Sequence, residues 1–402
     1  MLPLTLSAFT AVSAMGRGVE ATLASLAARR SGLRPCDLEG IDLETWIGRV
    51  EGVEDVRLPP GLERFDCRNN RLAQMALETD GFAAAARAAT RRYGPERVAV
   101  VLGTSTSGIA SCEDAYRRRD PADGALPPDF DYEHTHDLFS LARFVRAALG
   151  LEGPASVIST ACSSAAKAFG DAAELMAAGT CDAAIVGGAD SLCGMTLHGF
   201  AALELLAKGP TRPFAADRDG ISIGEAAVLV LLERPDAAHP TGADAAERVS
   251  LLGFGASADA HHMSSPHPEG IGAIRAMRDA LASAGLSPAD IDHVNFHGTG
   301  TKANDAAEDR AVFQVVGRGP ACSSTKGWSG HALGTSGALE AVIAALCIAH
   351  GLVPGCLNVA HLDPTLRCDV ATQNRARPVR RVLSNSFGFG GSNCSLILGA
   401  GR

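Results

Sequence analysis

Cys162 stands where a buried strand is expected to end and a helix to begin. An apolar run at 157–159 precedes it, and an alanine-rich helical pattern starts at 165. A thiol at the amino end of a helix meets the positive end of the helix dipole and backbone N–H groups that have no helical partners. Both favour the thiolate, the nucleophilic form of cysteine. The alternative is a small buried hydrophobic side chain, the usual state of a free cysteine.

Two histidines lie in loops of small residues that follow apolar runs. His297 opens the sequence HGTGT at 297–301, and His331 ends the sequence STKGWSGH at 324–331. A histidine held between a strand and such a loop can exchange protons or hydrogen bonds with a substrate. A single histidine is more often a structural residue, so each loop by itself is a weak indication.

A glycine-rich loop near the carboxyl end reads FGFGGSN at 387–393. Such a loop can aim several backbone N–H groups at one point, as an oxyanion hole requires. It has neither the Lys-Ser/Thr ending of a P-loop nor the spacing of a dinucleotide-binding loop, so it is not a phosphate-binding signature.

These loops require strands and helices to hold them. Short β-like runs alternate with longer Ala/Leu-rich helical patterns, which predicts an α/β fold with buried strands. Strands are expected at 98–102, 155–159, 183–186, 227–232, 293–296 and 395–398, with a first strand and turn within 1–15. Helices are expected at 19–28, 72–91, 165–178, 271–284 and 337–350.

The segment 235–246 is rich in Ala, Asp, Pro and Gly and is the predicted linker between halves at 1–235 and 246–402. The halves echo each other, since STAC at 159–162 and STK at 324–326 both lead into helical patterns. This echo suggests an internal duplication. The first half carries the candidate nucleophile, and the second carries both histidines.

The composition limits the class of protein. The net charge of −9 is spread along 402 residues, which argues against a nucleic-acid partner. The short basic run at 377–381 is either a solvated face or a docking patch for an acidic partner. No stretch reaches the roughly 18 uninterrupted apolar residues of a membrane span, and no basic residue precedes the first apolar run. We therefore expect no membrane insertion and no signal peptide.

Eleven scattered cysteines include no C-x-x-C pair, which argues against a disulfide framework and against a zinc site. The histidines at 261, 262 and 267 lack a carboxylate or cysteine at ligand spacing, so no metal site is predicted. A chain rich in free thiols fits the reducing cytoplasm.

Taken together and in order, the motifs resemble those of the elongating β-ketoacyl-ACP synthases, the type I/II ketosynthases of fatty-acid and type II polyketide assembly (ACP, acyl carrier protein). The resemblance covers nearly the whole chain and is carried by TACSS at 160–164, PTRPF at 210–214 with DRDG at 217–220 and GE at 224–225, HMSSP at 262–266, HGTGT at 297–301, STK at 324–326 with GH at 330–331, and NSFGFGG at 385–391. It implies the thiolase fold, an α/β fold with two duplicated βαβαβαββ halves in five layers, α-β-α-β-α.

The resemblance also implies a mechanism. Cys162 takes an acyl chain from acyl-ACP as a thioester, and His297 and His331 then assist the decarboxylation of malonyl-ACP. The resulting carbanion attacks the acyl group and gives a β-ketoacyl-ACP two carbons longer. Backbone N–H groups of Cys162 and Phe389 form the oxyanion hole, and Phe389 also gates the pocket. Neutral imidazoles suit this task, because a developing oxyanion needs donors.

Other residues receive supporting roles by the same resemblance. Lys326 stays charged and orients its neighbours with Glu340, or the two form an ordinary salt bridge that supports the fold. Thr299 and Thr301 hydrogen-bond the phosphopantetheine arm, or they cap a turn. Ser264 and Thr106 complete the expected substrate-binding set. No resident cofactor is expected, because the substrates are carried on the phosphopantetheine of ACP.

Three segments depart from the family pattern: SAFTAV at 7–12, GISIGEA at 220–226 and GTSTSG at 103–108. The third segment carries more hydroxyl groups than the corresponding segment of housekeeping enzymes. A pocket lined by hydroxyls would suit a flat, unsaturated or aryl-ended chain better than a flexible saturated one. We therefore expect a specialised pathway, such as an aryl-polyene type II polyketide system.

Alternative functions follow from the same residues. A thiolase pairs its nucleophile with another cysteine and a starter-type synthase uses a His/Asn pair, so His297 with His331 argues against both. A non-catalytic chain-length partner of a ketosynthase heterodimer would lack the nucleophile, whereas Cys162 is present. A dimer is predicted across the strand at 183–186, and the sequence leaves open whether it is a homodimer or a heterodimer with a ketosynthase-like partner.

Overall fold

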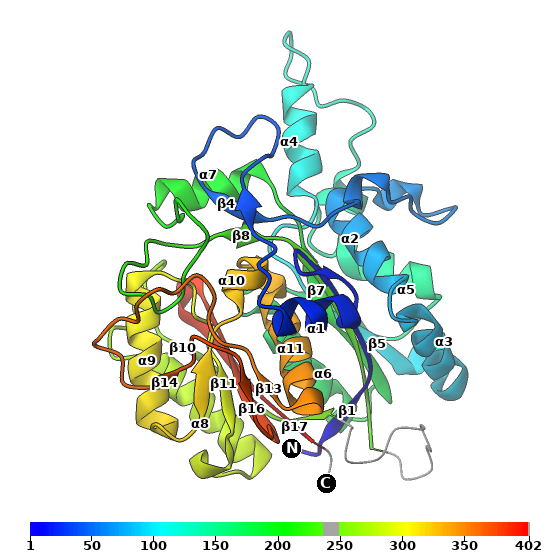
Figure 1. Ribbon diagram of the computed structural model, residues 1–402. Coiled ribbons are helices and arrows are strands. Elements are labelled where there is room, and N and C mark those ends of the chain that lie inside the picture. Colours follow the sequence, from blue (N-terminus) through cyan, green and yellow to red (C-terminus); the bar gives the residue numbers. More distant parts are fainter. Residues whose placement is uncertain (236–248, 401–402) are drawn as a thin grey trace.

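The computed structural model describes residues 1–235 and 249–400 (Figure 1). Beyond Pro235, the predicted linker lies outside the described residues, as does the start of the predicted second half at 246. The strands form a twelve-stranded mixed sheet in the order β14-β12-β11-β16-β17-β10-β1-β9-β7-β5-β6, with β2 beside β1. The order contains the same arrangement twice.

In the first half of the sheet, with the strands numbered along the chain, the order from the outer edge inward is third, second, fourth, fifth and first. β5 pairs in parallel with β6 and β7, while β9 is antiparallel to both β7 and β1. Its strands are β1 (Leu4–Ser13), β5 (Val98–Gly103), β6 (Ala155–Ile158), β7 (Ala183–Asp190) and β9 (Ala226–Glu233).

The second half repeats both the order and the directions. β11 pairs in parallel with β12 and β16, while β17 is antiparallel to both β16 and β10. Its strands are β10 (Val249–Ala258), β11 (His293–Asn295), β12 (Ala321–Ser323), β16 (Arg381–Gly388) and β17 (Ser392–Ala400), with β14 (Asp369–Val370) added at the outer edge. The predicted internal duplication is therefore confirmed. β1 and β10, the first strand of each half, pair with each other at Leu4 and Thr5.

Helices complete five layers. α6 (Ser164–Ala177) and α11 (Ser336–His350) pack against each other and against both halves of the sheet, so they form the central layer. In Figure 1 these two helices run through the middle of the molecule. The outer face of the first half is covered by α2 (Arg68–Leu77), α3 (Phe82–Tyr93) and α5 (Ser140–Leu149), and that of the second by α8 (Ile271–Ala284) and α9 (Lys302–Val316).

The central helix α11 is also apolar enough to resemble a membrane span. The helical segment Leu333–His350 has sufficient length and a mean hydropathy of 1.5, but 83% of it is buried inside the structure. Burial between two sheets accounts for this composition, because a helix surrounded by protein has no polar face. The segment is a core helix of the fold.

The remaining elements are short and lie around the sheet ends. They are α1 (Val19–Ala27), α4 (Ile109–Arg117), α7 (Gly194–Ala202), α10 (Lys326–Ser329), β2 (Gly16–Arg17), β3 (Arg34–Pro35), β4 (Trp46–Gly48), β8 (Ile223–Gly224), β13 (Leu352–Val353) and β15 (Arg375–Ala376). β3, β4 and β8 form a small separate sheet.

Most predicted elements are present, but the helix predicted at 72–91 is wrong in one respect. The chain forms α2 and α3 with a turn between them, where Asp80 and Gly81 have φ of 53° and 70°. Left-handed backbone cannot continue a right-handed helix, so the apolar period spans two helices. The predicted strand at 395–398 is the central part of β17.

The strand predicted to pair two chains is also wrong. β7, which contains 183–186, lies between β5 and β9 and is bonded on both sides. A strand with both edges occupied has no free N–H or C=O groups to offer another chain. Instead β6 ends the sheet, and in the described part of the chain it pairs with β5 alone; its four residues are half-buried.

Candidate active site

The carboxyl ends of the strands from both halves meet at one cavity of about 560 Å³. Cys162 follows β6, His297 follows β11, and Phe389 follows β16; all three line the cavity together with His331. Loops at the carboxyl ends of parallel strands share one edge of a sheet. The duplication places two such edges opposite each other, which is why residues 169 positions apart can touch.

The turn before Cys162 is held in a strained form. Ala161 has φ of 52°, the left-handed region that residues with a Cβ atom seldom adopt. The Ser164 hydroxyl accepts a hydrogen bond from the Thr160 N–H at 2.9 Å and donates one to the Ala161 carbonyl at 2.5 Å. This turn aims the thiol away from α6 and into the cavity.

Two glycines allow this turn to sit where it does. A Cβ atom on Gly103, at the end of β5, would lie 2.3 Å from the Ala165 nitrogen in the first turn of α6. A Cβ atom on Gly388 would lie 2.7 Å from the Thr160 carbonyl oxygen and 3.2 Å from the Cys162 nitrogen. Side chains at either position would push the nucleophile or the glycine-rich loop away.

The Cys162 sulfur has donors on more than one side. It lies 3.0 Å from Nε2 of His331, and the backbone N–H groups of Phe389 and of Cys162 itself are near enough to lower its pKa. These are the two N–H groups that the resemblance assigns to the oxyanion hole. Because both act on the sulfur, both would lie near a carbonyl carbon bonded to it.

The expectation of a thiolate in the resting site is wrong. Burial raises the pKa of the Cys162 thiol to about 11, although the Lys326 ammonium and the Phe389 N–H act to lower it. The helix end does not offset the loss of water around the sulfur. The resting site therefore holds a thiol, and its proton must leave during the reaction.

The two histidines are neutral. Burial, and after it the nearby Lys326 ammonium, keeps the pKa of His297 and of His331 well below the usual range. Their rings lie 5.2 Å apart at 81°. The Nδ1 atom of His331 lies 2.8 Å from the Ser336 hydroxyl oxygen, while Nδ1 of His297 is buried without a partner among the described residues. Neutral imidazoles were the form expected from the sequence.

Lys326 and Glu340 form a buried ion pair with an N–O distance of 2.5 Å and side chains 2% and 3% exposed. The same ammonium donates to the backbone carbonyl of His297. Burial raises the pKa of Glu340 to about 7, against the lowering effect of Lys326. The pair is thus a buried salt bridge that also bonds the His297 loop, and its role in orienting the site stays a prediction.

Thr299, Thr301 and Ser264 line the cavity as the resemblance implied. The hydroxyls of the two threonines lie 2.9 Å apart, and the Thr301 N–H donates to the Thr299 hydroxyl at 3.4 Å. These threonines therefore cap their own turn and also face the cavity. Phe389 packs against Phe200 of α7, with ring centres 5.5 Å apart, at the side of the cavity.

Thr106 is not among the described residues that line the cavity. Its hydroxyl donates to Asp190 Oδ1 at 2.9 Å and accepts from the Ser191 N–H at 3.0 Å. The neighbouring hydroxyls of Thr104 and Ser105 bond the same carboxylate oxygen at 3.2 Å. The hydroxyl-rich segment thus surrounds a buried carboxylate, and the inference that these hydroxyls shape an acyl pocket loses its basis.

Two carboxylates that hold the His297 loop were not predicted from the sequence. Glu308 accepts from the backbone N–H groups of His297 and Gly298 at 2.7 and 2.8 Å, and burial raises its pKa to about 8. Asp305, one helical turn earlier on α9, accepts from the Gly300 N–H. Their spacing of three residues could have indicated this role, because residues at i and i+3 lie on one face of a helix.

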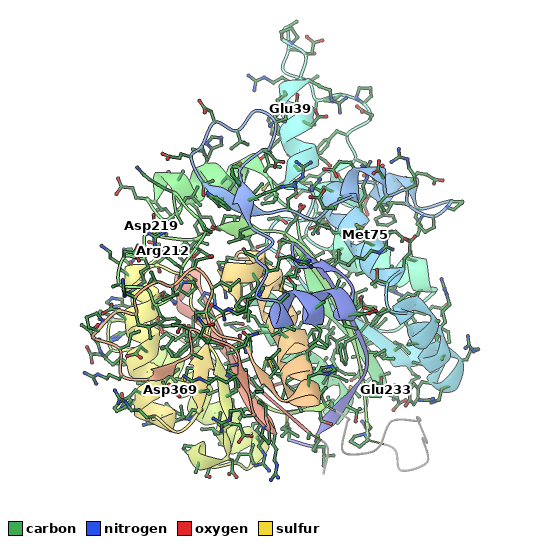
Figure 2. All side chains as sticks on the ribbon, viewed as in Figure 1. Glu39, Met75, Arg212, Asp219, Glu233 and Asp369 are labelled. Carbon is green, nitrogen blue, oxygen red and sulfur yellow. The ribbon has the colours of Figure 1, made fainter. Side chains whose placement is uncertain are left out.

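Charged residues surround the mouth of the cavity. Asp217, Arg218 and Asp219 line it, and Arg212 forms ion pairs with Asp217 at 3.2 Å and with Asp219 at 3.1 Å. Figure 2 labels Arg212 and Asp219 next to each other on this side of the molecule. The cations near this mouth are therefore partly neutralised by acidic neighbours.

The basic run at 377–381 lies away from the cavity. Arg381 begins β16, whereas the cavity residues Phe387 and Gly388 end it. The backbone N–H groups of Arg380 and Arg381 donate to Asp292, before β11. A carrier docked on this run would be at the wrong end of the strand, so its placement favours the solvated face.

The ligand atoms of Cys162, His297 and His331 lie within 4.8 Å of one another. One thiolate and two imidazoles are a donor set that zinc accepts. The sulfur carries a proton in the resting site, and the buried Lys326 ammonium acts on all three groups. Both features oppose a divalent cation, and the absence of a metal site stays a prediction.

Comparison with known proteins identifies the family of the chain. The family model for "Beta-ketoacyl synthase, N-terminal domain" matches residues 8–238, and that for the C-terminal domain matches 249–360. A Rhizobium meliloti protein named 3-oxoacyl-(acyl-carrier-protein) synthase 2 is 39% identical over 319 residues, 74% of this chain and 73% of that protein. A Vibrio cholerae protein of the same name is 30% identical across 96% of both chains.

Solved structures agree with these matches. A chain from the complex of the ketosynthase ApeO with its chain length factor ApeC, from Xenorhabdus doucetiae, superposes with a TM-score of 0.88 at 38% identity, covering 99% of this chain and 98% of that one. A β-ketoacyl synthase from Burkholderia phymatum gives 0.88 at 29% identity over the full length of both chains. The predicted thiolase fold is confirmed, and this chain belongs to the β-ketoacyl synthase family of acyl-transferring condensing enzymes.

Proposed function

We propose that the protein is a β-ketoacyl-ACP synthase that accepts an acyl group on Cys162 and extends it by two carbons from malonyl-ACP. The observation that carries this proposal is the placement of the Cys162 sulfur 3.0 Å from His331 Nε2, beside the His297 ring and two backbone N–H donors, on a 560 Å³ cavity. Nucleophile, donors and substrate space coincide there.

In the first step the Cys162 sulfur attacks the thioester carbonyl of acyl-ACP. The carbonyl oxygen becomes an oxyanion beside the N–H groups of Cys162 and Phe389, which stabilise it. The bond to the pantetheine sulfur then breaks. Because the resting group is a thiol, its proton passes in the exchange to the departing pantetheine thiolate, and no net charge is left in the buried site.

In the second step malonyl-ACP loses carbon dioxide, and the electron pair of the broken bond forms an enolate on the thioester. The neutral rings of His297 and His331 provide hydrogen bonds to the enolate oxygen. The enolate carbon attacks the acyl-Cys162 carbonyl and displaces the sulfur. The Cys162 thiolate that is released takes up one proton from solvent, and the product leaves as β-ketoacyl-ACP.

The partners follow from this chemistry. The substrates arrive on the phosphopantetheine of ACP, so we infer no resident cofactor. Thr299, Thr301 and Ser264 line the cavity, which supports the proposal that they bind the arm. A solved complex titled as a type II polyketide carrier protein with its ketosynthase, 26% identical to this chain, supports the ACP partner. The cytoplasm is the proposed compartment for eleven free thiols.

We place the subunit contact at β6. This strand ends the sheet with half-buried residues, and Cys162 follows it after three further residues. Strand addition at such an edge would extend the sheet into a second subunit. The ketosynthases titled in complex with chain length factors support a ketosynthase-like heterodimer partner, and a homodimer is the alternative.

The pathway proposal now rests on the relatives. Identity of 38% to a chain of the ApeO–ApeC complex supports a pathway in which a ketosynthase works with a chain length factor, and the aryl-polyene branch of type II polyketide assembly is our choice. Identity of 39% to a protein named 3-oxoacyl-(acyl-carrier-protein) synthase 2 keeps fatty-acid synthesis as the alternative. A non-catalytic chain-length subunit is disfavoured, because Cys162, His297 and His331 form a complete site.

Mass spectrometry of the intact protein and its carrier tests the function. The chain, with and without a ketosynthase-like partner subunit, is incubated with saturated and polyenoyl acyl-ACPs and malonyl-ACP. We expect an acyl adduct on Cys162 and a carrier product two carbons longer. Cys162→Ala should lose both, while Cys347→Ala, which removes a buried thiol from the distant end of α11, should keep both.

Two outcomes would contradict parts of this proposal. Condensation retained by Cys162→Ala would exclude the assigned nucleophile. Efficient extension of saturated chains combined with refusal of polyenoyl chains would exclude the aryl-polyene branch while leaving the ketosynthase function intact.

A further inference from the structure

Ser336 lies behind His331, on the side of the ring away from the nucleophile. Its hydroxyl oxygen is 2.8 Å from Nδ1, and the opposite nitrogen, Nε2, is 3.0 Å from the Cys162 sulfur. We propose that Ser336 donates its proton to Nδ1 and thereby fixes the His331 tautomer that carries hydrogen on Nε2. The inference rests on the proposed function and adds a positioning residue to it.

The tautomer decides what His331 can do. A neutral imidazole has one N–H donor and one acceptor nitrogen, and the low pKa of His331, set by burial and the Lys326 ammonium, keeps the ring neutral. With hydrogen on Nε2, the ring offers a donor to an enolate oxygen in the cavity. With hydrogen on Nδ1, it would present a lone pair there and repel the same oxygen.

The direction of the Ser336 bond follows from its surroundings. Ser336 is 2% exposed, and within the described residues Nδ1 of His331 is the single hydrogen-bond partner of its hydroxyl. If Nδ1 donated to the oxygen, the hydroxyl proton would be buried without an acceptor. If the hydroxyl donates, only lone pairs are left unpaired, which native interiors tolerate better than an unpaired donor.

Both members of the pair are held in place by backbone bonds. The His331 N–H donates to the Ser222 carbonyl at 2.7 Å, and the Gly224 N–H donates to the His331 carbonyl at 2.9 Å. On the other side, Thr335 donates its N–H to Asp190 Oδ2 at 2.8 Å and its hydroxyl to the same oxygen at 3.1 Å. These bonds fix the start of α11, where Ser336 is the first residue.

Asp190 therefore links the two halves at the site. It ends β7 in the first half, and it holds the turn that delivers Ser336 to a histidine of the second half. The hydroxyl-rich segment after β5 saturates the other oxygen of the same carboxylate. The segment that the sequence suggested as an acyl pocket therefore holds Asp190 in place, and Asp190 in turn positions Ser336 beside His331.

The test replaces the hydroxyl and follows the two steps separately. Ser336→Ala should slow carbon dioxide release from malonyl-ACP about tenfold, the equivalent of one hydrogen bond. KM for malonyl-ACP should stay unchanged, because Ser336 does not line the mouth of the cavity, and acyl transfer to Cys162 should change much less, since its oxyanion faces other donors. Ser336→Thr, which returns the hydroxyl, should restore decarboxylation.

A matched control and a spectroscopic measurement accompany the kinetics. Ser329→Ala removes a hydroxyl from the end of α10, two residues before His331. This hydroxyl is 3% exposed and bonded to the Gly330 carbonyl at 2.9 Å, so its loss should leave decarboxylation near wild type. Nitrogen NMR of the whole protein labelled with ¹⁵N-histidine, assigned with His331→Asn, should show hydrogen on Nε2 in the wild type. Ser336→Ala should shift this signal toward a mixture of tautomers.

Three results would overturn the proposal. They are a wild-type His331 with its hydrogen on Nδ1, unchanged decarboxylation in Ser336→Ala, and equal losses in Ser336→Ala and Ser329→Ala. The proposed function fails on a different observation, the absence of any acyl adduct on wild-type Cys162. The NMR result does not depend on turnover, so the two failures are distinguishable.

Discussion

The two halves of the molecule have the same strands in the same order, yet they place different side chains at their carboxyl edges. The third strand leads to Cys162 in the first half and to Lys326 in the second, and each residue lies between that strand and the central helix of its half. A nucleophile and a cation thus lie on the corresponding connections of the two halves. The comparison shows how a duplicated scaffold can supply opposite components of one reaction.

The loops after the second strands differ in the same way. In the first half, hydroxyls and backbone N–H groups of 104–106 turn inward onto Asp190. In the second half, Glu308 and Asp305 bind backbone N–H groups of 297–300, which leaves the His297 ring and Thr299 on the cavity. Each half uses buried carboxylates as anchors, but the loop of the first half supports the site while that of the second half forms it.

Among the substitutions that test this comparison, replacement of Lys326 should have the largest effect. Lys326→Met leaves Glu340 buried without its cation and removes the bond to the His297 carbonyl. We expect a loss of unfolding free energy of about 3–5 kcal/mol, measured by urea denaturation. Condensation should be lost as well, because the ammonium that lowers the pKa of Cys162 is gone.

The double variant Lys326→Met/Glu340→Leu separates these effects. Replacing both members of a buried ion pair with apolar groups is often neutral for stability. We expect most of the unfolding free energy to return while condensation stays lost. A double variant that recovers activity together with stability would show that the pair only supports the fold.

The anchoring carboxylates give an intermediate effect. Asp190 accepts seven hydrogen bonds, and Glu308 accepts three. An amide places donors against donors at either position, so Asp190→Asn should lower the unfolding free energy by about 2–3 kcal/mol and Glu308→Gln by about 1–2 kcal/mol. Urea denaturation measures both, and a larger loss for Glu308→Gln would reverse the assignment of the first half as the supporting one.

The pH dependence of Cys162 gives the smallest effect, tenfold for each pH unit. Because its thiol pKa is raised to about 11, the thiolate fraction rises with pH throughout the neutral and mildly alkaline range. Alkylation of Cys162 by iodoacetamide, followed by peptide mass spectrometry, should accelerate in proportion without levelling off below pH about 9.5. A plateau near neutral pH would indicate a thiolate stabilised by the end of α6.

Much of the site could be predicted because its chemistry is local in sequence. Cys162, His297 and His331 each follow an apolar run and precede small residues, and the structure places all three on one cavity. Glu308 and Ser336 were missed, since a carboxylate or hydroxyl inside a helix looks like an ordinary polar residue. Their roles depend on which backbone N–H or ring nitrogen lies opposite, and sequence spacing does not report that.

The sequence by itself determined the class of fold, the internal duplication and the identity of the nucleophile, because apolar periodicity and motif order are properties of the chain alone. Tertiary structure decided the rest. Burial, which depends on every neighbour in space, made the Cys162 pKa high where the helix end predicted it low. Pairing on both sides removed 183–186 from the subunit contact, and Asp190 drew the hydroxyls of 104–106 away from the cavity, since hydrogen bonds form with the partners that packing brings within reach.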